Sequence, residues 1–92
     1  MEPSIDQKVK YLTRRKEEIS FLFDYYKESN FEAIGFIAHK IKGNGSTFGY
    51  PNLSNIAMDI EAAIAESNFL KLEALINQLN IFVSSELIRL RP

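Results

Sequence analysis

The stretch FEAIGFIAHKIKG, residues 31–43, carries the apolar spacing from which the fold can be predicted. Its apolar residues recur three or four positions apart, which is typical of one face of an amphipathic helix and not of a strand. Ser29 and Asn30 precede the stretch and offer cap chemistry for its first turn. The same phase continues downstream and predicts a helix over about residues 31–48 that ends near Gly49.

The same helical spacing continues on both sides of this stretch. Upstream it begins after Ser4, and Gln7 three positions later completes the form of a capping box. Downstream, Pro51 fits the first turn of another helix, where its missing N–H costs nothing. The tetrapeptide ESNF, at residues 28–31 and again at 66–69, indicates two helix breaks. The four predicted helices cover about residues 5–28, 31–48, 51–66 and 69–90.

Four amphipathic helices joined by links of a few residues predict an all-α fold, an antiparallel up-down-up-down four-helix bundle. The chain has 92 residues, of which 46% are hydrophobic and 25% charged, enough for one core and too few for two. We therefore expect residues 1–92 to form a single domain. Isolated helices of this length are marginal in water, so the apolar faces must pack together.

Composition argues against several classes of function. The net charge of -1 provides no overall source for the counterion release that drives nucleic-acid binding. The chain has no cysteine, no apolar leader segment and no stretch approaching the roughly 20 apolar residues that span a bilayer. We expect a cytoplasmic monomer that binds neither nucleic acid nor membrane and that holds no metal or cofactor of its own.

The single histidine, His39, falls on the side of its predicted helix opposite the apolar face. Gly35, Lys42, Gly43 and Ser46 lie on the same side, one or two turns away. A glycine inside a helix costs about 1 kcal/mol relative to alanine, so the outward glycines oppose helix formation. Without Cβ atoms they leave room for another macromolecule at the imidazole. We interpret Gly35, Gly43 and Ser46 as partner-contacting residues.

The chemistry that His39 can perform is nucleophilic. An exposed imidazole is largely neutral at pH 7 and keeps a lone pair for attack. Lys42 can neutralise an anion that is held at the ring. The chain has no second histidine, no cysteine and no phosphate-binding loop ending in Lys-Ser or Lys-Thr. The group that His39 attacks must therefore come from another molecule.

Two neighbouring features allow alternative interpretations, and Gly45 has a structural role. Phe36, at the margin of the exposed side, is either a partner contact or an aromatic packed against the first helix. The basic stretch KVKYLTRRK, residues 8–16, either steers an acidic partner or, as we prefer, forms a solvated helix face. Gly45 falls on the apolar side, where it predicts close approach by another helix.

The residues around His39 resemble the signature of the histidine-containing phosphotransfer (Hpt) domains of two-component phosphorelays. The four-helix plan and the chain length match this family as well, so the resemblance covers nearly the whole chain. Ile41 and Ile60 stand where the family more often has leucine, and both are volume-conserving changes. The matching positions are His39-x-x-Lys42-Gly43, Gly49, Leu53 and Ile60-Glu61.

The resemblance implies a phosphoryl carrier without kinase activity of its own. His39 would accept a phosphoryl group on Nε2 from the aspartyl phosphate of a response-regulator receiver domain and pass it to another receiver. Lys42 would support the phosphoryl charge, and Gly43 would leave room for the partner. The receiver would supply Mg²⁺, and a hybrid histidine kinase is a further candidate partner.

Two other classes of function stay open at this point. One is an adaptor that docks on a receiver domain or a histidine kinase and inhibits it without carrying phosphate. The other is a helical structural module with no reactive centre. The clustering of glycine around His39 argues against the second of these, because a structural helix gains nothing from two outward glycines.

Overall fold

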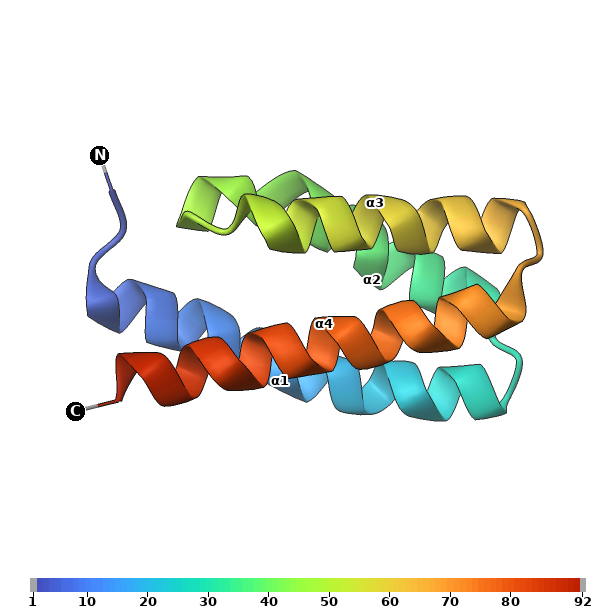
Figure 1. Cartoon of the computed structure of the whole chain (residues 1–92), viewed down its shortest axis with the longest axis horizontal. Coiled ribbons are helices and arrows are strands. Elements are labelled where there is room, and N and C mark those ends of the chain that lie inside the picture. Colours follow the sequence, from blue (N-terminus) through green and yellow to red (C-terminus); the bar gives the residue numbers. More distant parts are fainter. Residues whose placement is uncertain (1, 92) are drawn as a thin grey trace.

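The computed structural model describes residues 2–91 as four helices packed side by side (Figure 1). Successive helices run in opposite directions, and each packs against two neighbours, so that α2 lies diagonally across from α4. The predicted up-down-up-down bundle is confirmed, whereas the predicted domain limits at residues 1 and 92 lie outside the described residues. The helices are α1 (Ile5–Lys27), α2 (Phe31–Asn44), α3 (Pro51–Ala65) and α4 (Phe69–Leu90), with a 3-10 turn, η1, at Ser46–Phe48.

Side-chain caps fix the starts of α1, α2 and α4, whereas α3 begins at Pro51 without one. Ser4 Oγ accepts a hydrogen bond from the Gln7 N–H at 3.1 Å, and the Gln7 side chain accepts one from the Ser4 N–H at 2.8 Å. The predicted capping box is therefore present. Asn30 and Asn68 cap α2 and α4 with their side-chain oxygens. Each cap satisfies a backbone donor that the first turn of a helix leaves free.

The core lies where the four apolar faces meet. Arg15 is buried beside them, so the expectation that the basic residues of the stretch 8–16 form a solvated helix face was wrong at this position. Ile5, the first residue of α1, is apolar but 63% exposed. The largest fully buried side chains are Leu12, Ile19, Leu22, Ile34, Ile41, Leu53, Ile60, Leu72, Ile76, Leu79 and Val83.

The two ESNF breaks lie at the same end of the bundle, on the right in Figure 1. Ser29 and Ser67 both adopt the left-handed conformation, with φ of 57° and 55°. The rings of Phe31 and Phe69 stack with their centroids 4.3 Å apart. The Tyr26 hydroxyl donates a hydrogen bond to the Phe69 carbonyl at 3.0 Å. Equivalent turns thus close this end of the bundle with an aromatic contact.

The α-helical part of α2 is shorter than the sequence predicted. We expected a helix over residues 31–48, but the α-helix ends at Asn44 and a 3-10 turn follows at Ser46–Phe48. Gly49 then ends the segment with φ of 88°, as predicted. Polar contacts made by Gly45 and by α3 replace the α-helical hydrogen bonds of the last turn.

Gly45, directly after α2, lies where α3 approaches closely, which confirms its predicted role. A methyl group on Gly45 would lie 2.6 Å from Ser54 Oγ and 2.9 Å from the Ser54 nitrogen. Because that space is free, Ser54 Oγ accepts a hydrogen bond from the Ser46 N–H at 3.0 Å. The Gly45 carbonyl accepts one from the Tyr50 N–H at 2.8 Å. These contacts set the register between α2 and α3.

Replacing Gly45 by alanine is expected to lower the free energy of unfolding by about 2 kcal/mol, because the new methyl group overlaps Ser54. Gly43→Ala is the matched control in the same helix, since no atom lies within 4 Å of the added methyl group. That control should raise stability by about 0.5 to 1 kcal/mol. Urea unfolding followed by circular dichroism measures both, and equal effects would contradict the assigned role of Gly45.

Candidate functional site

His39 lies on the outer surface of α2, at the side that faces α3. Its side chain is 70% exposed, and its Nδ1 lies 3.2 Å from Glu61 Oε2 on α3. An ionised carboxylate can only accept a hydrogen bond, so this contact assigns the ring hydrogen to Nδ1. Nε2 then keeps its lone pair, and it makes no hydrogen bond with any residue in the range 2–91. The exposed ring nitrogen is therefore the nucleophilic one.

Glu61 also holds Lys42. The Lys42 ammonium lies 2.8 Å from Glu61 Oε1, so one carboxylate pairs with both the ammonium and the imidazole. The Lys42 ammonium holds the pKa of Glu61 below its ordinary value, with a further contribution from His39 and against the opposing effect of partial burial. Glu61 is accordingly ionised at neutral pH. Lys42 therefore forms an ion pair and is not a freely solvated side chain.

The position of Glu61 beside His39 is the part of the site that sequence reasoning missed. Glu61 entered the sequence analysis only as one position of a family signature. One signal was available, because Glu61 directly follows the buried Ile60 and so lies at the edge of the packed face of α3. Its distance from His39, however, depends on the register between α2 and α3, which the contact at Gly45 sets.

The two glycines predicted to flank His39 differ in their surroundings. Gly43 is exposed, and a Cβ atom built there meets no atom within 4 Å. Gly35 is half-buried, and a Cβ atom there would lie 3.7 Å from Ile64 Cδ1 on α3. The prediction that both stand in open space is therefore corrected for Gly35, which turns toward α3. Their roles in partner binding stay predictions.

The other two predicted partner contacts are also exposed. Phe36 is 67% exposed, so it is not packed into the core against α1. The Lys40 ammonium lies 5.1 Å from the centroid of its ring. Ser46 is exposed at the start of η1, and its hydroxyl lies 3.3 Å from Ser54 Oγ. Both residues are accessible to a partner, and their contacts with one stay predictions.

Neither a metal cluster nor a membrane-spanning helix is found in the part of the chain that the structure describes. In residues 2–91, no group of three or more His, Cys, Asp or Glu side chains is arranged to hold a metal ion. The helices of that same range also lack the combination of length and apolar character needed to cross a bilayer.

Comparison with known proteins identifies the family. The family model for the Hpt domain matches residues 9–85, a span that includes all of α2 and α3 and most of α1 and α4. No match was found among curated proteins or among solved structures. Hpt domains take part in histidine phosphotransfer in phosphorelays, where they interact with receiver domains. With its four-helix bundle and the exposed histidine of α2, the chain belongs to the Hpt domain family of phosphoryl carriers.

Proposed function

We propose that this protein carries a phosphoryl group on Nε2 of His39, accepting it from the aspartyl phosphate of a receiver domain and passing it to another receiver. The contact between His39 Nδ1 and Glu61 carries the proposal. It leaves Nε2 as the nitrogen with an available lone pair, on a side chain that another protein can reach.

The transfer is a displacement at phosphorus. The Nε2 lone pair forms the N–P bond while the bond from phosphorus to the aspartyl oxygen of the receiver breaks, and the receiver's carboxylate leaves. Because the ring keeps its Nδ1 hydrogen, it becomes cationic in the product. Glu61 Oε2, 3.2 Å from Nδ1, stabilises that positive charge. Transfer to a second receiver reverses these bond changes.

The partner supplies the remaining chemistry. In this proposal the receiver contributes both the aspartate and the Mg²⁺ ion, and the Hpt chain contributes position and charge. Lys42 lies one turn from His39 on the same face of α2. When a phosphoryl group is attached to Nε2, the Lys42 ammonium turns from Glu61 toward the phosphoryl oxygens.

The proposal is tested by incubating the protein with each phosphorylated receiver domain of the source organism and Mg²⁺. We expect at least one receiver to transfer phosphate to the chain. The linkage should be labile in acid and stable in base, as a phosphoramidate is and a phosphoserine is not. If no receiver transfers phosphate to the folded protein, the proposed function is wrong.

Replacing Glu61 by glutamine is expected to slow transfer to His39 by about 10- to 100-fold, because the cationic ring loses its counter-charge. The rate at saturating receiver should fall while KM changes little, since Glu61 acts on the ring. Glu66→Gln, which removes the same charge from an exposed position at the end of α3, is the matched control. Equal transfer rates for the two variants would show that Glu61 has no role in transfer.

A further inference from the structure

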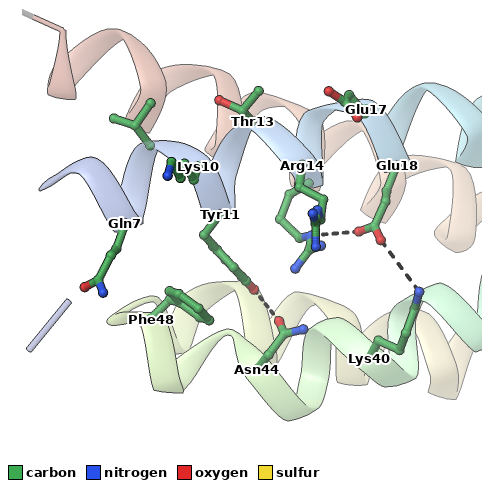
Figure 2. A pocket seen from close by; sticks show the side chains of 12 residues that line it. Gln7, Lys10, Tyr11, Thr13, Arg14, Glu17, Glu18, Lys40, Asn44 and Phe48 are labelled. Carbon is green, nitrogen blue, oxygen red and sulfur yellow. Dashed lines mark hydrogen bonds and ion pairs between the residues drawn. The ribbon is translucent and has the colours of Figure 1, made fainter. Parts of the chain in front are cut away.

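A groove of about 910 Å³ lies between α1 and α2 (Figure 2). The hydrogen bond from the Tyr11 hydroxyl to Asn44 Oδ1 crosses the groove, with Phe48 on one side of it and Lys40 on the other. An ion pair of 3.7 Å between Glu18 and Lys40 crosses it nearer the middle of α2. Lys40 lines the groove on the α1 side of α2 and His39 faces α3, but both side chains are exposed, so a partner that covers the outer surface of α2 can contact both.

The charge of this groove is opposite in sign to that of the whole chain. Two of the cations, Lys10 and Arg14, are exposed and form no ion pair with any residue in the range 2–91. The chain as a whole has a net charge of -1. The ionisable side chains that line the groove are the cations Lys10, Arg14, Arg15 and Lys40 and the anions Glu17 and Glu18.

Glu18 is neutralised by cations inside the groove, and Lys10 and Arg14 are not part of these contacts. The Arg15 side chain is only 8% exposed, and its Nε lies 2.7 Å from Glu18 Oε1. Lys40 approaches the other oxygen of the same carboxylate. The Arg15 guanidinium also lies over the Tyr11 ring at 4.6 Å. In residues 2–91 neither Glu18 nor the exposed Glu17 forms an ion pair with Lys10 or Arg14, so these two cations are available to an anionic partner.

Exposed aromatic residues continue this surface toward the middle of the bundle. The Tyr11–Asn44 and Glu18–Lys40 contacts fix the antiparallel register of α1 and α2. One further turn along each helix in that register brings Phe21 level with Phe36. Phe21, like Phe36, is largely exposed, at 55%. It lies on the same face of α1 as Arg14, which is seven residues earlier. Cations beside exposed aromatics are typical of protein interfaces.

We infer that an acidic surface segment of the receiver docks on the α1–α2 groove and its aromatic margin while the receiver's aspartyl phosphate reaches His39. The inference rests on the proposed function. It gives Lys10 and Arg14 of the basic stretch a role in steering an acidic partner. The sequence alone had favoured the other interpretation, a solvated helix face. Charges at the rim of an interface act mainly on encounter, so the groove affects binding and not the chemical step.

The test is the double variant Lys10→Glu/Arg14→Glu, which reverses two exposed charges that no ion pair holds in residues 2–91. Transfer is measured with a phosphorylated receiver that is active on the wild-type protein, over a range of receiver and NaCl concentrations. We expect kcat/KM to fall about 10-fold at low ionic strength through a higher KM, and the difference to disappear near 0.5 M NaCl. A decrease that is independent of salt would contradict electrostatic docking.

The matched control is Lys71→Glu/Arg91→Glu, which changes the net charge equally, at Lys71 in α4 and at Arg91 directly after α4, the helix diagonally across the bundle from α2. This control should change kcat/KM by less than about 2-fold. Equal losses in the two double variants, or no loss in either, would overturn the groove as a docking site.

A small phosphodonor separates this inference from the proposed function. Phosphoramidate needs no docking surface, so it should label His39 equally in the wild type and in the groove variant. If phosphoramidate labels the wild type and no receiver does, the proposed function itself is overturned. If a receiver is active and the groove variant matches the wild type, only the groove assignment is overturned.

Discussion

Replacing His39 by glutamine is expected to abolish the acid-labile phosphate that the proposed function predicts for the wild-type protein. Glutamine retains an amide N–H for Glu61 but has no nitrogen lone pair that can attack phosphorus. We expect labelling to fall at least about 1,000-fold, because the bond-forming atom is lost. The measurement is phosphate transfer on a gel, with acid and base treatment of the labelled band. Equal labelling of wild type and variant would exclude His39 as the acceptor.

Two controls accompany this variant. Because the His39 side chain is 70% exposed, stability should change by no more than about 0.5 kcal/mol, and urea unfolding checks that the fold is intact. Binding of the variant to the receiver should be retained. An adaptor that inhibits a receiver without carrying phosphate would keep its full effect in His39→Gln, so this variant separates the two classes of function.

Replacing Gly43 by glutamate is expected to reduce transfer from the receiver by about 100-fold, with little effect on stability. Gly43 is exposed with no atom within 4 Å of a built Cβ, so the fold accommodates the larger side chain. The carboxylate stands one turn from His39, where it fills the approach and repels a phosphoryl group. The gain in helix propensity is offset by placing an anion in the last turn of α2.

Two further substitutions separate bulk from charge at this position. Gly43→Ala adds a single methyl group and should leave transfer within about 3-fold of the wild type, since a methyl group fills little of the open space. Gly43→Gln has the size of glutamate without its charge and isolates the steric part of the effect. Transfer is measured from the receiver and from phosphoramidate. If Gly43→Glu transfers from the receiver like the wild type, Gly43 does not lie under the docked partner.

The fold could be predicted because helix periodicity, caps and breaks all point to the same four elements. Ser4 and Gln7 form the expected box, and Gly49 ends its segment as expected. The final turn of α2 could not be predicted, because Ser54 on α3 satisfies the Ser46 N–H. A backbone donor that is paired by another helix leaves no signal in its own segment.

The site residues on the same helix as His39 could be predicted from the sequence, whereas the contact with a residue of another helix could not. Lys42 and Gly43 follow His39 on one helix, so helical phase alone places them on its side. Glu61 belongs to another helix, and phase cannot give the register between two helices. Arg15 lies three residues after Leu12 and four before Ile19, so helical phase places it on the apolar face of α1. Its charge favours a solvated position, but in the structure the side chain is buried.

Because α2 and α4 lie diagonally across the bundle, substitutions on α4 are distant from the surface that carries His39. α4 packs directly against α1 and α3, and its backbone does not approach that of the helix that carries His39. Substitutions at well-separated sites with no shared partner combine additively in free energy. Substitutions on the solvent side of α4 and substitutions around the imidazole should therefore have additive effects on the free energy of unfolding. The surface of α4 can change in sequence, and the stability of the protein with it, without altering the chemistry at His39.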